Sequence, residues 1–565
     1  MKKIVSLLLA LTTLLGLLTA CGGAPAASSA ASTPDETSAE AAASTSEEVT
    51  STEEAPASAA EEVPTEAPSV ESIPIAMPLA NHDITYTMWL EWPPFLEGTS
   101  YATPNDFPFY QNLSAVSGVD FDFTQVSFMA AAEQFNLMVA SESYTDIICN
   151  PDKYSGSVDE AIENDIFADV TDLLGDYAPN YLNVINRDDE TRRDAYSQDG
   201  RVAVFWEIAK TPYPANSGLV IRQDWLDEVG MEKPETYEEL HDVLLAFKNE
   251  LGAASPIYVD GNAIMKELTA GYGFQADFTD LDGTAVFSAA ADNFSTYMEM
   301  THQWYEEGLI HQDFYVYAEN QVESDSEKVR LINSDQVGVW YNWCEDLQQY
   351  ESADPDYALS AITNPVRNKG DEIHLCSGVD PMVSTMGGWA ISTNCAADKV
   401  PTAMQLIDYL YTEDGSVMAN WGIENDTFTY QEDGTPRYTD VVLNNSELFT
   451  NAAIGVYCVF RGPILSDLSR FNQNVVGKLA EYVDVWSVQD NDYNMPAVSM
   501  NADDSNRYNS IKSDIDTALD EALPKFIIGD RPMEELPGFL DELETMGLSE
   551  MVELEQKALD AYYQK

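Results

Sequence analysis

Basic residues are scarce in this chain of 565 residues. Lys and Arg together number 27, against 97 Asp and Glu, and the formal net charge is -70. A field of that sign repels phosphate backbones and anionic surfaces. We therefore expect no nucleic acid partner and no polyanionic ligand, while the same charge helps to keep an exported protein soluble.

Cysteine and histidine are also rare. Apart from Cys21 the chain has five Cys, an odd number that cannot all pair, and no C-x-x-C spacing occurs. The five His are isolated along the sequence. We therefore expect no metal site and no cofactor. One disulfide remains open, and most of these Cys are interpreted as small buried apolar residues.

Common catalytic motifs are missing as well. The sequence contains no nucleophile elbow, no P-loop and no H-E-x-x-H. A glycoside hydrolase needs two carboxylates, but candidate pairs carry no weight among 97 acidic residues. The sequence thus predicts that the protein is not an enzyme, with a glycoside hydrolase and a surface adhesin as remote alternatives.

The first residues have the order of a secretory signal. Lys2 and Lys3 precede an apolar run over residues 4–20, and the run ends in the letters LTAC at Cys21. This ending resembles the bacterial lipobox, in which the Cys becomes the lipidated first residue of the mature chain. We predict a signal peptide over 1–20 and a lipid anchor at Cys21. An uncleaved anchor helix and a plain signal peptide are the alternatives.

The composition of the next segment, 21–81, predicts a tether. After Cys21 it consists almost wholly of Ala, Ser, Thr, Glu and Pro, with no Lys, Arg or aromatic residue. Such a segment buries too little apolar surface to offset the entropy of ordering it. A disordered stalk behind a lipidated Cys suits a protein that must clear a cell wall, which indicates a Gram-positive surface.

The remaining residues, about 480 in number, are too many for one hydrophobic core and indicate an α/β protein of two lobes. Thr236 and Glu239 form a capping box ahead of an apolar helix face, and the last 60 or so residues show helical periodicity. Short runs bounded by Gly, Pro, Asn or Asp predict strands in largely parallel sheets. These strands are 84–89, 145–149, 202–205, 219–222, 336–341 and 389–392.

Several longer segments together carry a resemblance to one protein family. They include YTDIICNPD (144–152), GLVIRQDWLDEVGMEKPETYEELHDVLLAFKNE (218–250), YMEMTHQWYEEGLIHQDF (297–314), GGWAISTNCAADKVPTAMQLIDYLYTEDG (387–415) and WGIENDTFTYQEDGTPRYTD (421–440). In their order and spacing they resemble the extracellular solute-binding proteins of family 1, in its large lipoprotein branch from Gram-positive bacteria, and the resemblance extends over 83–565.

The resemblance implies a two-lobed periplasmic-binding-protein-like fold, with a hinge and a ligand cleft between the lobes. One lobe would hold 82–213 and about 389–490, and the other 214–388 and about 491–565. The implied function is that of a monomeric surface lipoprotein, which passes an oligosaccharide to the permease subunits of an ABC importer. A binding protein for another solute, such as a peptide, is the alternative.

One departure concerns calcium. Many family members carry a loop of the form D-x-N-x-N-G-x-x-D/E after the capped helix, whereas residues 249–255 here read NELGAAS. This predicts that the family's calcium site is absent. Asp277, Asp280 and Asp282 before Gly283 are interpreted as a solvated acidic turn.

Sugar binding uses aromatic faces together with planar polar side chains, and ligands of open α/β sheets lie beyond the carboxyl ends of strands. Residues at such strand ends, with three further candidates near the return crossing and beyond it, form the predicted ligand site. They are Trp89, Glu91, Trp92, Asn150, Asp152, Trp206, Glu207, Tyr213, Trp340, Tyr341, Trp343, Glu345, Trp389, Trp421 and Arg461.

Overall fold

The computed structural model describes residues 71–565, apart from 260–267, 318–320, 348–349, 351–356, 377, 380, 460, 475–477 and 490. The predicted signal peptide, Cys21 and the tether up to residue 70 lie outside this part of the chain. None of the helices described is both long enough and apolar enough to cross a membrane.

The last residues of the predicted tether belong to the fold. Leu79 is buried in the first lobe, with Ile75 and Met77 packed against the same core. The backbone of Ile73 exchanges two hydrogen bonds with the Asn180 side chain. The expectation that the tether reaches residue 81 is therefore wrong for residues 71–81, because the alternating apolar residues of this stretch pack on the core of the first lobe.

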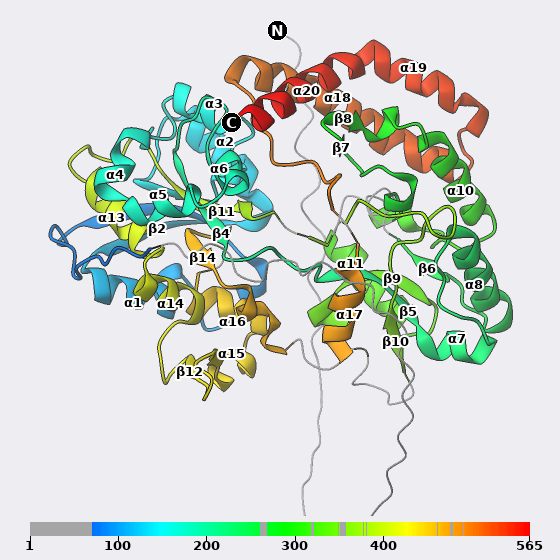
Figure 1. Cartoon of the computed structure of the whole chain (residues 1–565), viewed down its shortest axis with the longest axis horizontal. Coiled ribbons are helices and arrows are strands. Elements are labelled where there is room, and N and C mark those ends of the chain that lie inside the picture. The colour runs from blue at the N-terminus through cyan, green and yellow to red at the C-terminus, as the bar shows by residue number, and fades with distance from the viewer. Residues whose placement is uncertain are drawn as a thin grey trace, which may run out of the picture. The chain divides into compact units, whose positions relative to one another are not determined.

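The first lobe is built on a mixed six-stranded sheet in the order β14-β4-β11-β3-β1-β2, of which β2, β4, β11 and β14 are labelled in Figure 1. Its strands are β1 (Thr85–Trp92), β2 (Asp120–Ser127), β3 (Ile147–Cys149), β4 (Val204–Ala209), β11 (Val383–Ile391) and β14 (Ile464–Ser466). Its longer helices are α1 (Pro108–Ser117), α2 (Ala131–Ala140), α5 (Pro179–Ile185), α6 (Asp189–Ala195), α13 (Val400–Tyr409), α14 (Glu413–Trp421) and α16 (Thr450–Tyr457).

Short helices and a hairpin complete this lobe. They are α3 (Val158–Glu163), α4 (Leu174–Tyr177), α15 (Asp440–Leu443) and the pair β12 (Phe428–Tyr430) and β13 (Pro436–Tyr438). One hydrophobic core lies around the sheet, and a second cluster joins α14, α16 and the hairpin to Leu96 and Phe107.

The second lobe is built on a four-stranded sheet in the order β10-β5-β9-β6. Its strands are β5 (Ser217–Arg222), β6 (Ile257–Tyr258), β9 (Val339–Trp343) and β10 (Leu359–Ala361). The helices of this lobe, with the hairpin β7 (Phe278–Leu281) and β8 (Thr284–Phe287), bury two further apolar clusters. They are α7 (Gln223–Val229), α8 (Tyr237–Glu250), α10 (Phe294–Glu306), α11 (Gln321–Ile332), α17 (Lys478–Trp486), α18 (Ala502–Ile527), α19 (Leu536–Met546) and α20 (Leu548–Gln564).

Helix α8 shows how local sequence sets an element. The Thr236 hydroxyl accepts from the Glu239 backbone N–H, and the Glu239 carboxylate accepts from the Thr236 backbone N–H, so the predicted capping box is present. Leu240, Val243 and Phe247 then bury one face of the helix. A capping interaction of this kind stabilises a helix by about 1 kcal/mol.

The sheets are less parallel than expected. In the first sheet β11 runs antiparallel to both β3 and β4, and in the second sheet β5 runs antiparallel to β9 and β10. The reason is the chain path, since β11 re-enters the first sheet from the other lobe rather than through a helix packed on the same sheet.

The chain passes from the first sheet to the second between β4 and β5, returns between β10 and β11, and leaves again before α17. The lobe boundaries differ from the expected ones in two places. Strand β11 already begins at Val383 in the first sheet, rather than near 389. Helix α17 packs on β5 and β10 of the second sheet, although 389–490 was assigned to the first lobe, because its apolar face covers Val220 and Trp340.

The acidic run before Gly283 is a hairpin turn between β7 and β8. Asp282 and Gly283 have left-handed backbone conformations, with φ of 51° and 85°. The Asp280 carboxylate is buried, not solvated as expected, and it accepts hydrogen bonds from the Gly283 backbone N–H and the Tyr563 hydroxyl.

All five Cys of the described chain are free and buried, so the disulfide that the sequence left open is not formed there. Burial raises the pKa of the Cys458 thiol to about 12, which keeps it protonated.

Candidate functional site

A cavity of about 300 Å³ opens in the first lobe beyond the carboxyl ends of β1 and β3. Most of its wall is apolar and aromatic, and the polar lining side chains are few. The aromatic wall residues are Phe95, Phe107, Phe109, Tyr110, Phe128 and Trp389, and the polar ones include Glu91, Asn150 and Arg461. Such a lining, with a few polar groups among apolar faces, is typical of a small-molecule site.

The loop after β3 supplies the first polar group. Asn150 has a φ of 63°, a left-handed conformation that Asn tolerates better than most residues. Its side-chain oxygen accepts a hydrogen bond of 3.2 Å from the Glu91 backbone N–H, which ties the ends of β1 and β3 together. The amide is thereby fixed at the edge of the cavity.

One lysine holds two carboxylates beside this amide. The Lys153 Nζ lies 3.0 Å from the Glu91 carboxylate and 3.0 Å from the Asp152 carboxylate. Burial alone would lower the pKa of Lys153, but the hydrogen bonds to Asp152 and Glu91 outweigh it and raise the pKa above its ordinary value. Lys153 therefore keeps its positive charge between the two carboxylates.

Arg461 enters the cavity from the segment before β14. It has a left-handed φ of 54°, and its Cα approaches the strand β11 at Gly387. A Cβ at Gly387 would lie 2.9 Å from both the Arg461 Cα and the Glu207 carboxylate, so only glycine permits this approach. Glu207 in turn contacts the guanidinium of the fully buried Arg470 at 3.3 Å.

Trp389 and Tyr110 form part of the aromatic wall. Their rings are nearly parallel, with an interplanar angle of 14° and centroids 6.3 Å apart. Trp389 lies in the middle of the sheet, opposite Cys149 on β3 and Phe205 on β4. It is 2 % exposed, so the cavity reaches only its edge.

Among the predicted site residues, the structure brings Glu91, Asn150, Trp389 and Arg461 together at this cavity. Asp152 is linked to it through Lys153, and Glu207 lies behind it at Gly387. Trp92 stacks on the lining residue Phe107, with ring centroids 5.7 Å apart.

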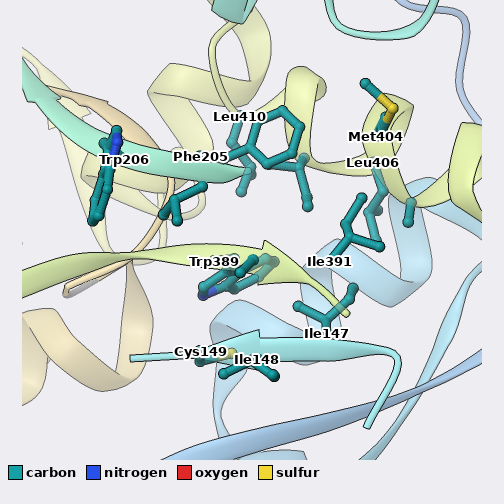
Figure 2. Close-up of a cluster of buried hydrophobic side chains, with 14 of the residues drawn as sticks. Ile147, Ile148, Cys149, Phe205, Trp206, Trp389, Ile391, Met404, Leu406 and Leu410 are labelled. Carbon is teal, nitrogen blue, oxygen red and sulfur yellow. The ribbon is translucent and has the colours of Figure 1, made fainter. Parts of the chain in front are cut away.

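Four predicted tryptophans lie in the hydrophobic core instead. Trp89 packs edge-on against Phe135, and Trp206 donates from its indole N–H to the Ala195 carbonyl. Figure 2 shows Trp206 with Phe205 and Trp389 among the buried side chains of the first sheet. Trp340 and Trp421 are buried in two other clusters. Burial in these clusters corrects the assignment of the four side chains to a ligand surface: three of them come from strands inside packed cores, and Trp421, the last residue of α14, packs against Phe428 and Tyr438.

The other predicted residues of the second lobe lie at the end of β9. Trp343 is 44 % exposed, and Tyr341 shares a hydrogen bond of 2.8 Å with the Ser217 hydroxyl. Glu345 follows in a short 3-10 turn, and its side chain lies outside the described structure. No cavity found in the described residues includes Trp343, so its place in a ligand site stays a prediction.

Tyr213 lines a different, larger cavity of about 690 Å³. The walls of this cavity include all three crossing regions, with Pro212, Val379 and Asn494 among them. Burial raises the pKa of its Asp194 to about 6, and that carboxylate accepts a hydrogen bond from the Tyr562 hydroxyl. Two aromatic residues, Tyr213 and Tyr562, line this cavity, against six in the first one, so we take the aromatic cavity as the candidate ligand site.

The sequence did not reveal most of the aromatic wall. Phe128 is 44 % exposed and follows β2, a strand that was not predicted. Phe95, Phe107 and Tyr110 come from loops and a helix whose apolar residues predict core packing equally well. A strand prediction for DFDFTQVS (120–127), from the alternating Phe121 and Phe123, is the signal that would have placed Phe128 at the end of a strand.

The chain matches the family model of the bacterial extracellular solute-binding proteins over residues 109–417. The chain belongs to this family. The fructooligosaccharide ABC transporter substrate-binding protein FusA of Streptococcus pneumoniae is 24 % identical over 496 residues, which are 81 % of this chain and 88 % of FusA. The polygalacturonan/rhamnogalacturonan-binding protein YtcQ of Bacillus subtilis is 20 % identical over 341 residues, 58 % of this chain and 64 % of YtcQ.

Solved structures show the same two-lobed fold. The alginate-binding protein AlgQ2 superposes with a TM-score of 0.69 and 20 % identity, over 88 % of this chain and all of AlgQ2. FusA in complex with kestose superposes with a TM-score of 0.65 and 22 % identity, over 85 % of this chain and 99 % of that structure.

Proposed function

We propose that this protein is the substrate-binding lipoprotein of an ABC importer and that it captures an oligosaccharide at the cell surface. The observation that carries the proposal is the cavity beyond β1 and β3, where aromatic faces surround a few fixed polar groups. Aromatic rings contact the apolar C–H faces of sugars, and the Asn150 amide and Arg461 guanidinium can bond hydroxyl groups. The relationship to FusA supports the same class of ligand.

In this account the lobes close on the ligand about the three crossing regions. The ligand favours the closed state only through contacts that the open state lacks, so the second lobe must contribute some of them. Trp343, exposed at the end of β9, is the side chain we assign to that role. The closed form is then the shape that the permease subunits recognise.

The lipid anchor at Cys21 and a monomeric state complete the proposal. The letters LTAC at the end of the apolar run support the anchor, which would keep the protein beside its permease on the outer face of the cell membrane. Binding without turnover follows from the assigned role.

Small-angle scattering and product analysis test this function together. A thermal-shift screen first identifies a binding oligosaccharide. Adding it should reduce the radius of gyration of the purified protein, and mass spectrometry should recover the ligand intact. Catalytic cleavage of the oligosaccharide would instead place the chain among glycoside hydrolases.

A further inference from the structure

We infer that the ligand of this cavity is a neutral oligosaccharide and that chains of uronic acid residues are rejected. The inference rests on the proposed function and narrows it. It comes from the charged groups at the cavity and behind its wall, which compensate one another. FusA is named for fructooligosaccharides, AlgQ2 for alginate and YtcQ for polygalacturonan and rhamnogalacturonan. The charge of the ligand therefore differs among these proteins, and similarity to them does not determine it.

The loop side of the cavity has no surplus cation. Lys153 is held at 3.0 Å by each of two carboxylates, Glu91 and Asp152. Glu91 lines the cavity itself and its side chain is only 6 % exposed. A sugar carboxylate arriving here would meet a buried anion whose counterion is already shared, and like charges in a poorly solvated site repel strongly.

The opposite side has two cations and one carboxylate, but only one of the cations lines the cavity. Arg461 lines the cavity, and its backbone and the Glu207 carboxylate both approach strand β11 at Gly387. Arg470 is fully buried, contacts Glu207 at 3.3 Å and donates to the Val459 carbonyl, so it does not face a ligand. The arrangement offers a uronate no pair of converging cations.

The charges of the group sum to zero, since three cations stand against three carboxylates. They are Lys153, Arg461 and Arg470 on one side and Glu91, Asp152 and Glu207 on the other. A polyuronate carries one negative charge on each sugar, and its recognition requires excess Arg or Lys. The field of the whole chain, with a net charge of -70, adds repulsion at long range. The apolar rings of the wall, by contrast, suit an uncharged sugar face.

Calorimetric titration with matched oligosaccharides tests the inference. Purified protein is titrated with neutral fructo-, gluco-, galacto- and manno-oligosaccharides, and with oligogalacturonate and oligoalginate of the same lengths, at low and at physiological ionic strength. We expect at least one neutral oligosaccharide to bind, and the acidic ones to bind about 100-fold more weakly or not at all, with the gap narrowing as salt increases. An acidic oligomer that binds as tightly as the best neutral one overturns the inference and leaves the proposed function standing. Heat from none of the sugars refutes both.

A double variant tests the assigned charges directly. Glu91→Gln with Asp152→Asn removes both carboxylates from Lys153, and we expect affinity for oligogalacturonate to rise about tenfold or more. The matched control, Glu133→Gln with Asp172→Asn, removes the same charge from two exposed positions of the same lobe. An equal rise in both proteins would show that total charge, and not the group around Lys153, rejects the acid. The wild-type titrations decide the inference even if the Glu91 variant folds poorly.

Discussion

Trp343 allows the proposed closure to be tested at one side chain. It ends β9 opposite Ser217, the first residue of β5, directly after the chain has crossed from the other lobe. Its side chain is 44 % exposed, whereas Trp340 on the same strand is fully buried. An exposed indole at this end of the sheet is the aromatic face that a closing second lobe can present to a sugar.

The size of the effect follows from the exposed area. Aromatic side chains bury about 150–250 Å² when fully covered. Covering the 44 % that Trp343 exposes removes roughly 70–110 Å² from water, or about 2–3 kcal/mol at ~25 cal/mol per Å². Trp343→Ala should therefore weaken ligand binding roughly 30- to 150-fold. The free energy of unfolding of the empty protein should change by less than about 1 kcal/mol, because no closed cavity is created.

Trp340→Ala and Trp89→Ala are the matched controls. Both side chains are buried, at 0 % and 2 % exposure, and each loss should cost about 3–5 kcal/mol of stability. The assay combines urea unfolding of the empty proteins with calorimetric affinity. If Trp343→Ala binds as tightly as the wild type, the second lobe does not hold the ligand through this indole, and our account of closure is wrong.

Three further predictions concern the anchor, a buried acid and a buried ion pair. Cys21→Ala should release the protein or leave an uncut precursor, and a wild-type mature chain that begins elsewhere without lipid, by mass spectrometry, would contradict the anchor. Burial raises the pKa of Glu555 to about 7, so the folded state holds this proton more tightly than the unfolded state, and the stabilisation present below about pH 4.5 is lost as the pH rises through 7. The melting temperature of the wild type should therefore fall between pH 5 and pH 8. The fall should be less steep in Glu555→Gln and as steep as in the wild type in the exposed control Glu553→Gln. Equal slopes in all three proteins would refute the assignment of this pH dependence to Glu555. Glu207→Gln should cost about 3–5 kcal/mol in urea unfolding, because it leaves the buried Arg470 without its carboxylate, and a loss below about 1 kcal/mol would show that the pair is not important for stability.

Features set by local chemistry could be predicted from the sequence. The capping box at Thr236 and the apolar face of α8 are present as expected, because both depend on residues within one or two helical turns. The core strands were recognised, although their ends moved by a few residues. Strand β2 was missed because acidic Asp120 and Asp122 and polar Thr124 and Gln125 interrupt its apolar pattern, and the strand lies at the sheet edge.

The site could be predicted only in part. Glu91 and Asn150 were found because the carboxyl ends of β1 and β3 meet at one edge of the sheet, which a strand prediction already implies. Burial of Trp89 and Trp206 could not be predicted, since it depends on helices that cover the strand from distant parts of the chain. The antiparallel course of β11, which brings Trp389 between β3 and β4, likewise depends on where the chain returns from the second lobe.

The most direct test of the central claim is a crystal structure of the protein with the oligosaccharide that the titrations identify. We predict that one end of an uncharged ligand occupies the cavity beyond β1 and β3, in contact with Asn150, Tyr110 and Arg461. A ligand bound in the cavity of the crossing regions beside Tyr213, with the aromatic cavity empty, would contradict the account.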